Sequence, residues 1–286
     1  MRIDAHQHFW RYAENAGDFP WMTEDLAAIR RDFLPIDLEP LRRENGIDGT
    51  VAVQAREREA ETDFLRDLAD GDASILGVVG WLDLCAEDID ARLDAYAGRD
   101  ALKGLRMLIH DREDPDFADG EPHARGVGRL AARGLTYDLL LRTIHLPAAI
   151  RLVDRLPEQR FVVDHIAKPR MDGGDREPWE RDLRAIAERP NVFCKLSGLV
   201  TEADWHAWRA DTFTPYLDVA LEAFGPERLM IGSDWPVCTL AADYGRALNV
   251  VVDWSEKLAD EEREAILGGT CARFYGLDTG GARRDA

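Results

Sequence analysis

Eight short apolar stretches recur along the chain, and each is followed by a segment with the spacing of an amphipathic helix. Their length and their content of valine, leucine and isoleucine are typical of strands that are buried on both faces of a parallel sheet. The predicted strands cover residues 3–8, 49–54, 75–84, 102–109, 135–141, 160–165, 192–197 and 228–234.

Helices are predicted between these strands and after the last one. They cover residues 38–45, 59–70, 86–97, 124–133, 146–155, 178–188, 205–224, 241–258 and 260–275. Eight strand–helix units in a chain of 286 residues match the order and size of a (β/α)8 barrel. An open doubly wound sheet is the alternative, but no glycine-rich phosphate turn follows the first strand. We therefore predict an α/β protein with a single (β/α)8 TIM barrel over residues 1–277 and a disordered tail over residues 278–286.

A long segment without clear periodicity, residues 9–37, follows the first predicted strand. It is rich in aromatic residues, among them Trp10 and Trp21. Loops of this length inside a compact domain often act as lids or binding loops. Their aromatic rings could stack on the apolar face of a sugar-like ring, or they could fix the loop to the barrel, which is the commoner use.

Acidic residues dominate the composition, with 55 Asp and Glu against 36 Lys and Arg and a formal net charge of −19. This excess argues against nucleic acid or an anionic membrane as a partner, because both are bound by basic surfaces. The four cysteines are scattered without a CxxC pair, which favours reduced thiols over a zinc knuckle or disulfides. We find no signal-peptide pattern and no apolar run near the roughly 20 residues that span a bilayer, so we expect a cytoplasmic protein. The sequence leaves both a monomer and a homo-oligomer open.

Polar residues gather at the carboxyl ends of the predicted strands, where the active site of a barrel lies. His6 and His8 stand two residues apart in the first strand, so their imidazoles share one face and can bind a metal or move a proton. Charged side chains at a barrel's strand ends are costly unless they are used. The other candidates are Asp83, Arg106, His110, Asp164, His165, Lys195, Ser197 and Asp234.

Three motifs resemble the amidohydrolase superfamily. They are Ile3-Asp4-Ala5-His6-Gln7-His8-Phe9-Trp10, Asp164-His165-Ile166-Ala167-Lys168-Pro169 and Ile231-Gly232-Ser233-Asp234-Trp235-Pro236. More narrowly, the chain is similar to the amidohydrolase-2 group that hydrolyses sugar-acid lactones, such as L-fuconolactonases and L-rhamnonolactonases. The similarity runs from residue 3 to about residue 277. It implies a sugar-acid lactone as the small-molecule substrate.

Metal-rich members of the superfamily carry a lysine or glutamate on strand 4 and histidines on strands 5 and 6. Here no lysine stands at the active end of strand 4, and Asp138 is on strand 5 where no histidine is found. A binuclear centre is therefore not expected. The remaining four residues could hold one zinc ion, or the enzyme could need no cofactor, as the lactonase resemblance allows. These four residues are His6, His8, His165 and Asp234.

Lactone hydrolysis requires a base for water, stabilisation of the carbonyl oxygen and a proton for the ring alkoxide. We assign the base to Asp234 and expect apolar surroundings to raise its pKa. His6, His8 and His165 would polarise the carbonyl or orient the water.

The expected substrate contacts come from one arginine, one lysine and three tryptophans. Arg106 would hold ring hydroxyls or the carboxylate product, although it could instead pair with Asp83 or Asp138. Lys195 could bind substrate or pair with Asp164, and Asp164 is expected to orient a histidine. The tryptophans would line the sugar face; they are Trp10, Trp21 and Trp235.

The histidines outside the motifs are expected in loops or on the surface; they are His110, His123, His145 and His206. Two other functions remain as alternatives. One is a zinc-dependent decarboxylase of the same superfamily, and the other is a non-catalytic barrel that binds sugar acids.

Overall fold

Eight parallel strands form the centre of the computed structural model, which describes residues 1–98, 100–171 and 176–279. They are hydrogen-bonded to one another in the order of the sequence, as a (β/α)8 barrel requires. Their bounds are β1 Ile3–Gln7, β2 Gly49–Val53, β3 Ile75–Gly80, β4 Leu102–Met107, β5 Thr136–Leu139, β6 Phe161–Val163, β7 Val192–Leu196 and β8 Leu229–Ile231.

The sheet closes where the chain after β8 meets β1. Gln7 forms a parallel bridge with Trp235, the His8 N–H donates to the Trp235 carbonyl at 2.7 Å, and the Asp234 N–H donates to the His6 carbonyl at 2.8 Å. These bonds join the two chain segments that carry the first and last motifs. The predicted TIM barrel is confirmed, and its closure sets His6 and His8 beside Asp234.

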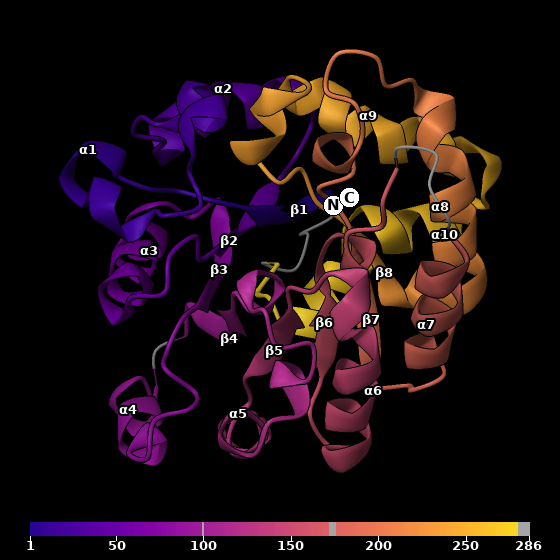
Figure 1. Cartoon of the computed structure of the whole chain (residues 1–286). Coiled ribbons are helices and arrows are strands. Elements are labelled where there is room, and N and C mark those ends of the chain that lie inside the picture. The colour runs from indigo at the N-terminus through magenta and orange to yellow at the C-terminus, as the bar shows by residue number, and fades with distance from the viewer. Residues whose placement is uncertain (99, 172–175, 280–286) are drawn as a thin grey trace, which may run out of the picture.

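The helices lie outside the strands (Figure 1). In α6, for example, Leu146, Ala149 and Val153 are buried and share one face, so the helix turns its apolar side to the interior. The helix bounds are α1 Tyr12–Asn15, α2 Pro35–Glu44, α3 Glu59–Gly71, α4 Ile89–Ala95, α5 Glu121–Val127, α6 Leu146–Arg155, α7 Glu177–Ala187, α8 Ala210–Phe224, α9 Tyr244–Trp254, α10 Asp260–Glu264 and α11 Thr270–Tyr275.

The elements differ from the prediction mainly at their ends. The apolar pattern continues past the hydrogen-bonded part of a strand, so the predicted strand 75–84 ends at Gly80. The predicted helix 260–275 is interrupted by a π-helical turn, Ala265–Gly269, which contains two glycines. Glycine has a low helix propensity, which explains why the regular helix breaks there. The predicted tail, 278–286, lies outside the described residues from 280 onward, and the domain boundary at 277 stays a prediction.

The segment predicted as irregular, residues 9–37, is more regular than expected, because it contains α1, 3-10 turns and the first residues of α2, which begins at Pro35 and not at Leu38. Most of its aromatic rings fix it to the barrel: Phe9, Trp10, Phe19 and Phe33 are all buried. In the described part of the chain, no helix has both the length and the apolar character needed to cross a membrane.

Candidate active site

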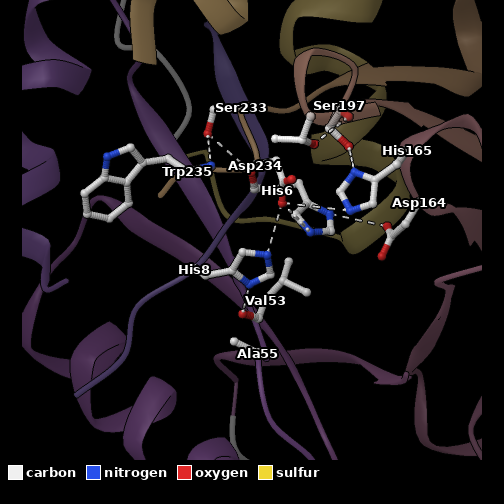
Figure 2. Close-up of polar contacts among 12 residues, drawn as sticks. His6, His8, Val53, Ala55, Asp164, His165, Ser197, Ser233, Asp234 and Trp235 are labelled. Carbon is white, nitrogen blue, oxygen red and sulfur yellow. Dashed lines mark hydrogen bonds and ion pairs between the residues drawn. The ribbon is translucent and has the colours of Figure 1, made fainter. Parts of the chain in front are cut away.

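Three imidazoles surround one carboxylate at the carboxyl ends of the strands (Figure 2). The Asp234 Oδ1 atom lies 3.3 Å from His8 Nε2, 3.8 Å from His6 Nε2 and 3.9 Å from His165 Nε2. All four residues are nearly or fully buried. The structure therefore brings together the four residues that the sequence assigned to catalysis or to a metal, although they come from β1 and from the segments that follow β1, β6 and β8.

Hydrogen bonds on the far side of two imidazoles fix their orientation. His8 Nδ1 lies 2.7 Å from the Val53 carbonyl oxygen, and His165 Nδ1 lies 2.8 Å from Ser197 Oγ. A carbonyl oxygen only accepts, so His8 donates from Nδ1 to Val53, and its Nε2 atom is held facing Asp234. Burial lowers the pKa of both His6 and His165 well below the usual value, which favours their neutral forms.

The expectation that the pKa of Asp234 is raised is wrong. Burial by itself acts in that direction, but the nearby His165 and the hydrogen bond with His8 outweigh it, so the pKa lies below its usual value. Asp234 is therefore ionised near neutral pH and able to accept a proton. The sequence showed the apolar walls around this position but not how close the imidazoles come.

A second polar cluster lies beneath the imidazoles, inside the barrel. The ammonium group of Lys195, which is fully buried, lies 2.6 Å from Asp138 Oδ2, 3.1 Å from Asp164 Oδ1 and 3.2 Å from His6 Nδ1. Asp164 Oδ1 is also 3.4 Å from His6 Nδ1, as expected for a residue that orients a histidine. Lys195 does not line the cavity above, so it forms the ion pair considered as the alternative, and it is not placed to contact a substrate.

Arg106 joins the two clusters. Its NH1 group donates to Asp164 Oδ2 at 2.9 Å and lies 3.1 Å from His6 Nε2, while NH2 donates to the Gln54 carbonyl. The ion pair predicted as an alternative, with Asp83 or Asp138, is wrong, because the partner is Asp164. Arg106 also lines the cavity, so its predicted contact with substrate remains a prediction.

One of the three candidate tryptophans, Trp21, lines the cavity. Trp10 is buried and donates from Nε1 to the Arg31 carbonyl at 2.8 Å, and Trp235 is buried against Phe33. Figure 2 shows the Trp235 indole directed away from the imidazoles. Neither Trp10 nor Trp235 is placed to touch a ligand of this cavity, because both rings fill the space under the loop after β1.

The cavity above Asp234 has a volume of about 400 Å³. Part of its wall comes from loop residues to which the sequence reading gave no role. Lys168 could have been suspected from the motif that contains His165, and His110 from its place at the end of strand 4. No signal in the sequence placed the remaining residues of this group in the cavity wall. These wall residues are His110, Asp111, Arg142, Lys168, Glu202 and Trp205.

Two further histidines expected in loops or on the surface are buried instead. His123 is hydrogen-bonded to Tyr137 in the core, and His145 lies 3.2 Å from the Arg142 N–H, which donates to its Nδ1. His206 is exposed, as predicted. The three buried cysteines, Cys194, Cys238 and Cys271, pack in the interior.

The donor set around Asp234 fits a metal ion. Ligands about 2.0–2.2 Å from a tetrahedral zinc lie roughly 3.3–3.6 Å apart, close to the separations between Asp234 Oδ1 and the three imidazoles. The ligand atoms of His6, His8 and Asp234 lie within 4.8 Å of one another, so these three residues would hold the ion. His165 Nε2, 3.9 Å from Asp234 Oδ1, lies next to them.

A family model described as Amidohydrolase matches residues 3–277. The chain is 43% identical to an L-fucono-1,5-lactonase of Burkholderia multivorans over 97% of this chain and 96% of the relative. It is 38% identical to an L-fucono-1,5-lactonase of Burkholderia ambifaria over 97% of this chain and 96% of the relative.

Crystal structures show the same similarity in three dimensions. An amidohydrolase from Burkholderia multivorans with bound Zn superposes with a TM-score of 0.92 at 43% identity, covering 97% of this chain and 99% of that one. The similarity in sequence and in fold thus extends over almost the whole of each chain.

Proposed function

The chain belongs to the amidohydrolase family, and on that premise we propose that it is a lactonase that opens a sugar-acid lactone, such as L-fuconolactone or L-rhamnonolactone, to the free acid. The observation that carries the proposal is the Asp234 carboxylate, whose Oδ1 atom has three imidazoles around it; Asp234, His8 and His165 also line an open cavity. The two lactonase relatives, similar over nearly their full length, support the same reaction.

Asp234 acts as the base in the first step. All of its contacts with the imidazoles use Oδ1, so Oδ2 is the oxygen that we assign to the attacking water. As the water oxygen bonds to the lactone carbonyl carbon, Asp234 takes one of its protons. His6, His8 and His165, held from behind by Asp164, Val53 and Ser197, orient the water and the carbonyl group.

The second step breaks the bond between the former carbonyl carbon and the ring oxygen. The ring oxygen leaves as an alkoxide and takes the proton that Asp234 had accepted, so the carboxylate is regenerated. Arg106 lies at the cavity wall and carries a fixed positive charge close to where the carbonyl oxygen becomes negative. A zinc ion held by His6, His8 and Asp234 would supply Lewis-acid stabilisation of that oxygen when bound.

A pH-indicator assay on a panel of aldonolactones tests the function. We expect acid release from at least one hydroxylated lactone. Failure on every lactone, together with release of CO2 from an aromatic carboxylate, would favour the decarboxylase. Binding of aldonates without any turnover would favour the non-catalytic barrel. Running the panel after chelation, and again after zinc is returned, shows whether the metal is required.

The role of Asp234 is tested by Asp234→Asn. Loss of the base should lower kcat by about 10²–10⁴-fold with a small change in KM, as is usual for general-base catalysis. Asp218→Asn is the control, because Asp218 is a half-exposed carboxylate on α8, outside the cavity. Unchanged turnover by Asp234→Asn in a folded protein would contradict the mechanism.

A further inference from the structure

An ion pair in the cavity wall has no role in the reaction as described. Lys168 Nζ lies 2.6 Å from Glu202 Oε1, and both residues line the cavity that contains Asp234. Their side chains are 14% and 18% exposed, so both are partly accessible from the cavity. Lys168 follows β6 and Glu202 follows β7, so two separate loops meet at this point.

The backbone that carries Lys168 is strained. His165, Ile166, Ala167 and Lys168 have φ values of 54°, 46°, 60° and 49°, and none of them is glycine. Left-handed backbone costs roughly 1–2 kcal/mol per such residue. The turn is held by a hydrogen bond from the Lys168 N–H to the His165 carbonyl at 2.8 Å and by one from Trp179 Nε1 to the Ile166 carbonyl at 2.6 Å.

Stability alone does not account for this turn. A partly exposed ion pair contributes about 1 kcal/mol or less, which does not offset four left-handed residues. Strained backbone persists where the surrounding structure holds a side chain in a required place. The turn places His165 in the active site at one end and Lys168 in the cavity wall at the other, so the position of Lys168 belongs to the site.

The chemistry of the pair indicates what it binds. Glu202 offers an acceptor and Lys168 a donor, side by side, in a pair without net charge. Neighbouring hydroxyl groups on a sugar ring are spaced about as far apart as two hydrogen-bonded atoms, so one can donate to Glu202 while the other accepts from Lys168. A substrate carboxylate at the same place would be repelled by Glu202.

Other charged groups of the cavity wall also have partners within the protein. Arg106 pairs with Asp164, Asp111 contacts His110 at 3.1 Å, and Arg142 donates from Nε to the His110 carbonyl at 3.2 Å. Beside Glu202, Trp205 also lines the cavity, and its Nε1 is bonded to the Thr201 carbonyl at 3.0 Å. Its ring therefore offers an apolar surface next to the ion pair.

We propose that Lys168 and Glu202 bind two neighbouring hydroxyl groups of the lactone and thereby select polyhydroxylated lactones over unsubstituted ones. This inference rests on the proposed lactonase function and adds the specificity-determining residues of the same site. A site that hydrogen-bonds the hydroxyl groups of its substrate discriminates against analogues that lack them, because those analogues cannot form the hydrogen bonds to the two charged groups.

The test compares two substrates, an aldono-1,5-lactone and δ-valerolactone, which has the same ring without hydroxyl groups. We expect Lys168→Met and Glu202→Gln each to lower the ratio of kcat/KM for the hydroxylated lactone to that for δ-valerolactone by at least about tenfold, mainly through KM. The double variant should lose less than the product of the two single losses, since both residues bind one diol. Lys257→Met is the control, because it breaks a lysine–carboxylate pair with Asp218 outside the cavity.

Other results would overturn the proposal. A fall in kcat/KM for both substrates by the same factor would show that the pair only positions His165. If both kcat/KM values, and therefore their ratio, stayed at the wild-type level, the pair would make no contact with the substrate. Turnover of neither lactone by the wild-type enzyme would remove the lactonase function itself, and the diol assignment with it. Thermal melting of each variant shows that a change in ratio is not caused by unfolding.

Discussion

His123 and His165 show how differently one residue type is used in this molecule. His165 faces the cavity, whereas His123 is 1% exposed in the core, with Nδ1 2.7 Å from the Ala118 carbonyl and Nε2 2.7 Å from the Tyr137 hydroxyl. Both nitrogens of His123 are satisfied in the neutral ring, one as donor and one as acceptor. The sequence singled out His165 by its motif, but nothing in the sequence showed that His123 is buried in the core.

The buried His123 should make stability depend on pH. Burial lowers its pKa from 6.5 to about 4, so between these values the unfolded chain binds more protons than the folded one. Stability therefore falls as the pH drops through this window, and this residue accounts for about 2 kcal/mol between about pH 7 and pH 5. Urea unfolding of the wild type and of His123→Gln at both pH values measures the difference.

The variant should show a shallower dependence of unfolding free energy on pH than the wild type. His206→Gln is the matched control, since His206 is exposed, and it should keep the wild-type slope. His6 and His165 are present in all three proteins, so their contribution cancels. If the unfolding free energies of His123→Gln and the wild type changed equally with pH, His123 would not be the cause of the pH dependence.

At the scale of elements, the segments that follow β6 and β7 depend on each other. Gly198, just after β7, has a φ of 63°, and a Cβ atom at this position would lie 2.5 Å from His165 Nδ1. His165 itself stands in the left-handed turn after β6. Glycine is thus required at this position for two reasons: the backbone is left-handed, and the His165 imidazole leaves no room for a side chain.

Gly198→Ala should therefore damage both stability and catalysis. We expect a loss of about 1 kcal/mol or more from the left-handed backbone, and a fall in kcat because the new methyl group displaces His165 from Ser197. Denaturation and steady-state kinetics on the hydroxylated lactone measure the two effects.

The variant Gly134→Ala separates the effect on stability from the effect on kcat. Gly134 has a similar φ of 70°, but a Cβ atom there would meet nothing within 4 Å. This variant should lose comparable stability and keep its kcat. Equal kcat values for the two alanine variants would show that Gly198 does not support His165.

At the scale of the whole molecule, a column of polar side chains runs through the barrel interior. Tyr275, in α11, donates its hydroxyl to Asp138 Oδ2 at 2.7 Å, and Asp138 pairs with Lys195, which in turn contacts His6. Barrel interiors are normally filled by branched apolar side chains. Here the last described helix is joined by hydrogen bonds to the residues that hold the active-site imidazole.

Tyr275 should therefore contribute to stability in two separable ways. Tyr275→Phe keeps the ring and removes one hydrogen bond to a charged group, so we expect a loss of about 1.5–3 kcal/mol. Tyr275→Ala also leaves a cavity and should cost roughly 3–5 kcal/mol, the range for large-to-small core changes. Chemical denaturation measures both, and equal losses would mean that the hydroxyl, and not the packing, carries the whole effect.

The sequence by itself determined the alternation of eight strands with helices and the four residues at the centre of the site. The strands follow from local information, because apolar periodicity marks them, and a barrel brings their carboxyl ends together. The strand ends gave a longer list of polar residues, and the resemblance to the amidohydrolases selected His6, His8, His165 and Asp234 from it before their distances were known.

Only the tertiary structure decided which neighbouring side chains reach the cavity. Trp10 and Trp235 turn into the core while Trp21 lines the cavity, and Lys195 lies beneath the site. These outcomes depend on how the loops pack over the strand ends. The pKa of Asp234 and the pairing of Lys168 with Glu202 were likewise beyond prediction, because each results from contacts between residues far apart in the chain.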